Sequence, residues 1–169
     1  LGTGAVDSIT TGDYNVGLGD SSGTAITSGA RNTGIGVFSI DAINTGSSNT
    51  GLGYAAGGGI TTASNNTAVG SQALQLTTTG ASNTAVGTLA LLSNTTGSWN
   101  IALGYNALDA NTTGTYNVAL GTSSLTTATT AAHNVAVGAD ALGLTTTGAN
   151  NTGIGSASLY SNTTGFSNV

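Results

Sequence analysis

The chain has 169 residues, of which 28 are glycine, none is proline or cysteine, and 38% are hydrophobic. Six aspartates and one arginine, with no lysine or glutamate, give a formal net charge of −5. The missing cysteines exclude disulfides and thiolate metal sites. The scarcity of cations excludes nucleic acid and anionic lipid surfaces as partners, and no apolar run reaches the ~18 residues of a membrane span, so we expect no membrane insertion.

One motif recurs at a fixed period of 17 residues: Asn, a β-branched residue, Ala or Gly, an aliphatic residue, and Gly. No insertion or deletion interrupts the series, and a period of this kind indicates a repeat architecture. We therefore expect an all-β fold, a parallel β-solenoid of ten 17-residue coils. The repeated asparagines are Asn15, Asn32, Asn49, Asn66, Asn83, Asn100, Asn117, Asn134 and Asn151, with a last copy at Asn168.

Each coil, numbered from its Asn at position 1, divides into two inward-facing stretches and two corners. Positions 2 to 4 predict a period-two strand, first at residues 16–18. Position 5 is always Gly, and position 15 is Gly except at Ala63 and Ala131, so we expect corners there. Between the corners, Ala or Ser at position 8 and usually Leu at position 9 predict the second stretch, and Thr at positions 13 and 14 predicts a ladder.

The predicted core is thin, because each coil offers only about two large aliphatic side chains. The Ala and Gly residues of positions 3 and 8 therefore predict a second buried surface, at which small side chains let other chains approach closely. We expect a homo-oligomer.

The two parts of the array carry their large side chains at different positions of the coil. Before Asn66, position 3 is Gly and position 12 is Ile, whereas from Asn66 on, position 9 is Leu and position 3 is mostly Ala. This exchange keeps the core volume roughly constant. We interpret residues 1–169 as a single repeat array, an excerpt of a longer chain, with a composition seam near 65/66.

Helical and disordered alternatives fit the repeat less well. Two Gly per coil and paired Thr oppose a helix, because each Gly costs about 1 kcal/mol relative to Ala. A disordered linker shares the Gly-, Thr- and Asn-rich composition, but it does not keep an aliphatic residue at one phase of a strict period.

No set of residues indicates catalysis, and we expect no enzymatic activity, cofactor or metal. Asp7, Asp41 and Asp109 share position 10 but lie two or more coils apart, so they make no carboxylate pair of the glycosidase kind. His133 is the only histidine, and it predicts neither a metal site nor a Ser/His/Asp triad.

Two rows of residues are candidates for a function. We interpret the Asn of position 1 as a structural ladder that bonds neighbouring coils and caps a turn. Position 17 is the most variable phase, so we expect it to face solvent. Its Tyr14, Trp99 and Tyr116 are candidates for stacking on the sugar rings of a cell-surface glycan, flanked by Tyr54 and Tyr105 of position 6.

The block Asn83-Thr-Ala-Val-Gly-Thr-Leu-Ala-Leu-Leu-Ser-Asn-Thr-Thr-Gly97 closely resembles repeats of bacteriophage and bacterial tail-fibre proteins. Residues 100–114 and 151–165 are similar, whereas residues 1–65 keep the spacing but depart at the Leu and Asn-Thr-Thr positions. The Ala-Val-Gly-x-x-Ala core is also similar to repeats of trimeric autotransporter adhesin heads. The resemblance implies a homotrimeric β-roll and a structural fibre shaft or adhesin stalk, extracellular or on a virion surface, that acts as a rigid spacer and attachment surface.

Two alternatives stay open. Ice-binding β-solenoids carry repeated Thr on a flat face, and the required Thr-x-Thr alternation occurs at residues 77–79 and 145–147. Coils that dock end to end would instead make a self-polymerising extracellular filament subunit. Thermal hysteresis tests the first alternative, and the intact chain length of native material tests the second.

Overall fold

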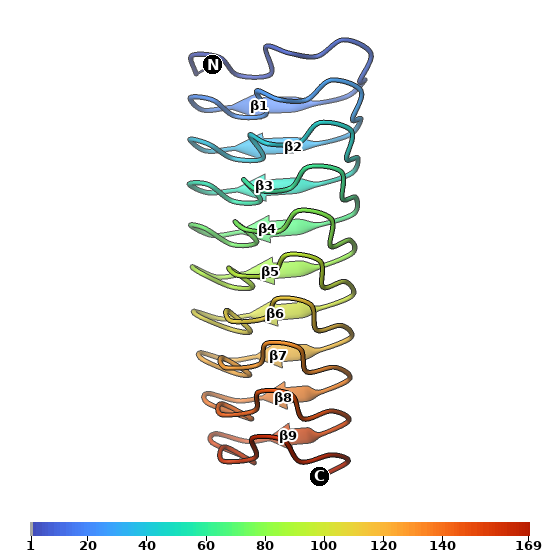
Figure 1. Ribbon diagram of the computed structural model, residues 1–169. Helices are drawn as coiled ribbons and strands as arrows, with labels where there is room; N and C mark the ends of the chain where they lie inside the picture. Colours follow the sequence, from blue (N-terminus) through green and yellow to red (C-terminus); the bar gives the residue numbers. More distant parts are fainter. Residues whose placement is uncertain (1) are drawn as a thin grey trace.

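The computed structural model describes residues 2–169 and is an all-β parallel solenoid, with the two termini at opposite ends of the stack (Figure 1). Its strands form one sheet in chain order, and the described residues contain no helix. The nine strands are β1 (Val16–Leu18), β2 (Thr33–Ile35), β3 (Thr50–Leu52), β4 (Thr67–Val69), β5 (Thr84–Val86), β6 (Ile101–Leu103), β7 (Val118–Leu120), β8 (Val135–Val137) and β9 (Thr152–Ile154).

Neighbouring strands pair in parallel at a constant offset of 17 residues, so that Val16 lies beside Thr33 and Val118 lies beside Val135. The predicted parallel β-solenoid with this spacing is therefore confirmed. The predicted number of ten coils is too high, because the nine strands are separated by only eight full steps. Residues 2–15, before β1, and the residues after β9 form no strand of their own.

The inside of the solenoid is narrow and holds mostly small side chains. The alanines of positions 3 and 8, such as Ala102 and Ala107, are 0% exposed within their own coil. The opposite walls lie so close that a Cβ atom on Gly34, at position 3, would come within 2.6 Å of Ile40 Cγ1. The prediction that the Ala and Gly stripe faces other chains is thus wrong, because this stripe lines the interior of its own coil.

Two apolar clusters fill this interior, one in each part of the array. The first consists of isoleucines and one alanine: Ile26, Ile40, Ile43, Ile60 and Ala63. The second runs from Ala56 to Leu142 and is built mainly from the alanines of positions 3 and 8 and the leucines of position 9, such as Leu74 and Leu91, with Ala128 and Ala131 added from positions 12 and 15. The core therefore changes its composition where the sequence changes, while the strand spacing stays the same.

The side chains of positions 2 and 4 point outward, because neighbouring residues of a strand point to opposite faces. Leu18 is 48% exposed and Leu103 is 40% exposed, while the residue between positions 2 and 4 is buried in every strand. We call the outward surface of β1–β9, made of positions 2 and 4, the sheet face. It holds thirteen aliphatic residues and five threonines, with no charged residue.

The rest of each coil consists of turns that are hydrogen-bonded to the neighbouring coils. Leu91 N donates to Ala107 O at 3.0 Å, and Thr95 N donates to Thr112 O at 2.9 Å. The corner glycine of position 5 has positive φ, for example 140° at Gly104, as predicted. The corner at position 15 depends on close approach instead, since a Cβ atom on Gly80 would lie 2.2 Å from Gly97 O.

Candidate functional site

The asparagine side chains of position 1 form a continuous column inside the solenoid. Asn83 Oδ1 accepts hydrogen bonds from the backbone N and the Nδ2 of Asn100, at 3.0 and 3.2 Å. Asn100 Nδ2 also donates to Gly114 O, at position 15 of its own coil, at 2.9 Å. Equivalent bonds join Asn15 to Asn32 at one end and Asn151 to Asn168 at the other.

This column satisfies polar groups that have no access to water. Asn32, Asn83, Asn100 and Asn117 are 0% exposed, and burying an amide without partners costs roughly 1–3 kcal/mol. Each side chain ties its coil to the preceding one and closes its own coil. The column is buried, so its amide groups are not available to a ligand.

The aromatic row of position 17 is exposed, and three of its rings stack on one another. The Trp99 and Tyr116 rings are nearly parallel, with centroids 6.3 Å apart, and the Tyr116 and His133 rings have centroids 5.0 Å apart. These residues belong to consecutive coils, so the rings stack along the solenoid and both faces of Tyr116 are covered. A sugar ring stacks on a free aromatic face, and this stack leaves only the outer faces of Trp99 and His133.

The structure does not bring the other predicted aromatic residues into this stack. Tyr14 is 82% exposed but lies five 17-residue steps before Trp99. Position 17 precedes each strand, whereas Tyr54 and Tyr105 follow their strands at position 6, so the sheet separates them from the row. His133 is a member of the stack that was not predicted, although it shares position 17 with Tyr14 and Tyr116.

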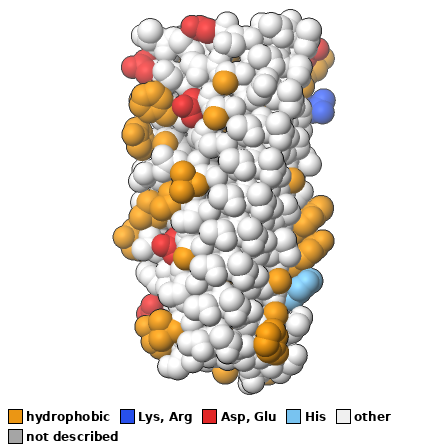
Figure 2. Space-filling view, in the orientation of Figure 1, with side chains coloured by type: hydrophobic (Ala, Val, Ile, Leu, Met, Phe, Trp, Pro, Cys, Tyr) orange, Lys and Arg blue, Asp and Glu red, His pale blue; other side chains and the backbone are white. Residues whose placement is uncertain are grey.

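Charged groups are sparse on the surface, and Figure 2 shows them as isolated spots. Residues 2–169 contain no group of three or more His, Cys, Asp or Glu side chains that could hold a metal ion. Asp109 Oδ1 accepts a hydrogen bond from Thr126 Oγ1 at 2.7 Å. This geometry identifies Asp109 as part of a local contact between coils.

The Thr-x-Thr segments at residues 77–79 and 145–147, on which the ice-binding alternative depends, do not present alternating threonines on one outward face. The first threonine of each segment, Thr77 or Thr145, is 0% exposed. The threonines of position 13 form a ladder between coils instead, in which Thr95 Oγ1 donates to Thr112 O at 3.0 Å. Outward threonines form two rows. Those of position 14 are exposed in each coil from Thr45 to Thr164, and those of position 2 lie on the sheet face: Thr33, Thr50, Thr67, Thr84 and Thr152.

Comparison of the chain with protein-family models, curated proteins and solved structures found no match. Within residues 2–169, no helix has the length and apolar character needed to cross a membrane. The described surface presents two extended candidate sites, which are the aromatic row of position 17 and the sheet face.

Proposed function

We propose that the chain is a shaft segment of a tail-fibre-like or extracellular filament protein, in which it serves as a rigid spacer and as an attachment surface. The observation that supports this proposal most strongly is the unbroken in-register stack from β1 to β9, joined by a buried asparagine column. Every coil is held to its neighbours by backbone and side-chain hydrogen bonds, which resist bending. In this proposal the segment has no catalytic role.

The shaft assembles as a homotrimer through the sheet face. Nine strands of three residues, spaced ~4.8 Å apart, give this face an area of about 400 Å², without a charge. An apolar surface of this size lies within the range of about 300–600 Å² for the largest patch of a typical monomer, and such patches often mark interaction sites. Three such narrow faces can close around one axis, so that the aliphatic side chains of positions 2 and 4 are removed from water.

Light scattering coupled to size-exclusion chromatography tests the assembly. A trimer has three times the 16.1 kDa mass of the chain. The double variant Val86→Lys/Leu103→Lys places two charges on the sheet face, at side chains already 37% and 40% exposed, so the coil should fold and remain a monomer. The control Thr96→Lys/Thr113→Lys alters exposed residues of position 14 in the same coils and should stay trimeric. A monomeric wild type, or a trimeric sheet-face variant, would contradict the proposal.

A second candidate function, ice binding, is favoured by one observation. Thr33, Thr50, Thr67 and Thr84 occupy the same outward position on the consecutive strands β2 to β5 and lie in register with one another. Thermal hysteresis that disappears in a Thr67→Tyr variant would support this function. Absence of hysteresis in the folded wild type would exclude it.

A further inference from the structure

A cleft of about 320 Å³ opens on the wall that follows strands β2 to β4. Two aromatic rings, one carboxylate and one amide group line it, and two glycines leave the space between them open. These residues come from three consecutive coils: Phe38 and Asp41, then Tyr54, Gly58 and Gly59, then Gln75. The volume falls within the range of small-molecule sites.

The cleft exists because one coil lacks two side chains. Asp41, Gly58 and Gln75 occupy position 10 of consecutive coils, so Gly58 leaves a gap between a carboxylate and an amide. A Cβ atom on Gly58 would lie 3.0 Å from Asp41 Oδ1, so even a short side chain there would enter the cleft. Most other coils hold a larger residue at position 10, such as Leu92 or Thr126, and the space beside the second glycine of this position, Gly143, is taken by the Tyr160 ring.

The aromatic part of the lining is preformed and accessible. The rings of Phe38 and Tyr54 meet edge to face, with centroids 6.2 Å apart and an interplanar angle of 80°. Phe38 is 43% exposed and Tyr54 is 53% exposed, so the rings keep free surface toward the cleft. The negative face of an aromatic ring attracts cations within about 6 Å of its centroid.

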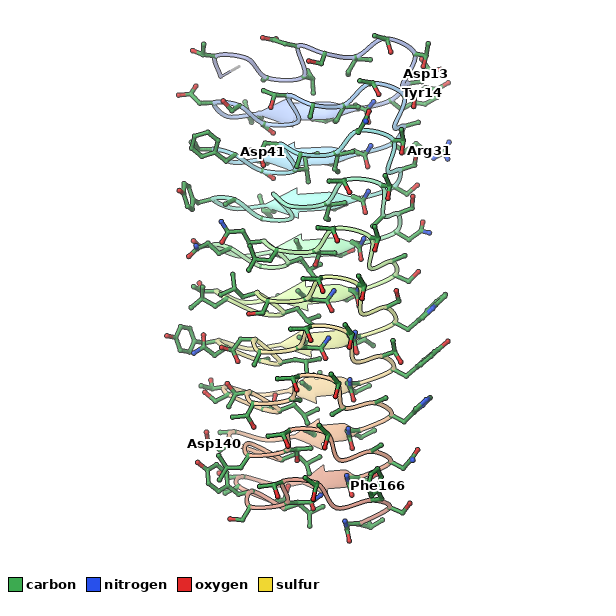
Figure 3. All side chains as sticks on the ribbon, in the orientation of Figure 1. Asp13, Tyr14, Arg31, Asp41, Asp140 and Phe166 are labelled. Carbon is green, nitrogen blue, oxygen red and sulfur yellow. The ribbon has the colours of Figure 1, made fainter. Side chains whose placement is uncertain are left out.

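Asp41 is a half-buried carboxylate without a cationic neighbour. Burial raises the pKa of this carboxyl, because partial removal from water disfavours the charged form. The chain has a single Lys or Arg, Arg31, and Figure 3 shows it on the opposite edge of the solenoid from Asp41. A ligand with positive charge would supply the missing counter-charge.

We infer that the cleft lined by Phe38, Tyr54, Asp41 and Gln75 binds an organic ammonium group, of the quaternary or primary alkylammonium class. The rings attract the cation through their faces, and Asp41 attracts it by charge. Gln75, whose Oε1 accepts a hydrogen bond from Gln72 Nε2 at 2.8 Å, adds a neutral polar group at the other side of the gap. Anionic ligands are repelled by Asp41 and by the net charge of −5.

Nuclear magnetic resonance titration of the folded chain with choline tests this inference, with the uncharged isostere 3,3-dimethylbutanol as the reference ligand. Choline should shift the amide resonances of Tyr54, Gly58 and Gly59 in a saturable manner and leave that of Trp99 unchanged. The isostere should bind at least tenfold more weakly. Added salt should weaken the binding of choline, because the Asp41 charge contributes to it.

Three variants separate the cleft from the rest of the surface. Asp41→Asn keeps the shape of the side chain and should weaken choline binding at least tenfold, whereas Asp109→Asn, at position 10 of another coil, should leave it unchanged. Gly58→Thr copies the residue type of Thr126 and should block the cleft. Circular dichroism checks that this variant stays folded.

Four outcomes would overturn the inference. They are equal binding of the isostere, tighter binding of a neutral methyl glycoside, undiminished choline binding by Asp41→Asn, and the absence of a saturable shift. None of these variants alters the sheet face, so the test of choline binding does not depend on whether the chain forms a trimer.

Discussion

The buried asparagine column concentrates more hydrogen bonds on single side chains than any other feature of the described residues. In Asn100→Ala, the backbone N of Asn117 loses its acceptor, Asn117 Nδ2 loses one of its two acceptors, and Gly114 O keeps only the bond from Asn111 Nδ2. Each buried group left unpaired costs roughly 1–3 kcal/mol, so we expect the free energy of unfolding to fall by about 3–5 kcal/mol. Chemical denaturation measures this loss. The control Thr96→Ala, at exposed position 14, should change stability by less than about 0.5 kcal/mol.

Backbone strain at the residue scale is spread over three positions in each coil. Positions 7, 9 and 17 adopt left-handed φ without being Gly, for example 53° at Ser123, 51° at Leu91 and 60° at Ser82. This conformation costs roughly 1–2 kcal/mol for a residue with a Cβ atom. The neighbouring coils hold these residues in place through backbone hydrogen bonds, such as Ser82 N to Ser64 O.

Ser82→Gly tests this strain directly. Glycine removes the cost of left-handed φ but loses roughly 0.4–1 kcal/mol through the greater entropy of the unfolded chain. We expect a net gain of about 0.5–1 kcal/mol in the free energy of unfolding, whereas Ser82→Ala, which keeps the Cβ atom, should be neutral. Equal effects of the two substitutions would show that φ at this position carries no strain.

Asp41 makes stability depend on pH in a definite direction. Because burial raises the pKa of its carboxyl in the folded chain, its contribution is most favourable below the unfolded pKa and is lost as the pH rises through the folded pKa. Asp41→Asn should therefore raise the thermal midpoint at pH 7, and this advantage should shrink toward pH about 4. A midpoint difference that does not change between these pH values would contradict this assignment.

At the scale of the coil, the corner at position 5 fixes the distance between neighbouring coils. A Cβ atom on Gly104 would lie 2.5 Å from Gly121 O, and its φ of 140° disfavours any other residue. At Gly155 the φ is also positive, at 115°, but no atom lies within 4 Å of a Cβ atom placed there.

Gly104→Ala should therefore destabilise the chain by more than about 4 kcal/mol, because it combines strain with overpacking. Gly155→Ala should cost only about 1–2 kcal/mol, the cost of left-handed φ alone. Denaturant unfolding of the two variants measures the difference. Similar losses in both would mean that close packing of the coils at this corner is not what makes Gly104 necessary.

The period of the sequence predicts the strands well, but it does not predict which strand face lies inside. Alternation in Ile101, Ala102 and Leu103 identifies a strand with two unlike faces. The larger face would normally be buried, yet here the coil is so narrow that only Ala or Gly fits between the walls. The wall separation depends on turn geometry at positions 7 and 9, where Leu and other residues adopt φ values that no local preference predicts.

The cleft is lined by residues of three consecutive coils, and the period alone does not reveal it. The run Gly57-Gly58-Gly59 marks the place where side chains are missing, and reading position 10 down the array would have placed Asp41 and Gln75 on either side of it. The contact of Phe38 with Tyr54 could not be predicted in this way, because these residues lie at different positions of their coils.

At the scale of the whole molecule, the reversal of faces bears on the proposed assembly of the chain. The small side chains lie inside each coil, so in the proposed trimer a partner chain would meet aliphatic and threonine side chains on the sheet face. The same charge-free surface runs over all nine strands, and its length grows with every added coil. A longer array therefore gains contact area in proportion to its number of coils.

Cryo-electron microscopy of the native material at high resolution tests this account most directly. We predict straight fibres with an axial repeat of ~4.8 Å, in which three chains surround one axis and the side chains of positions 2 and 4 fill the space between them. A single solenoid with a bare sheet face, or chains that meet through any other wall, would contradict the account.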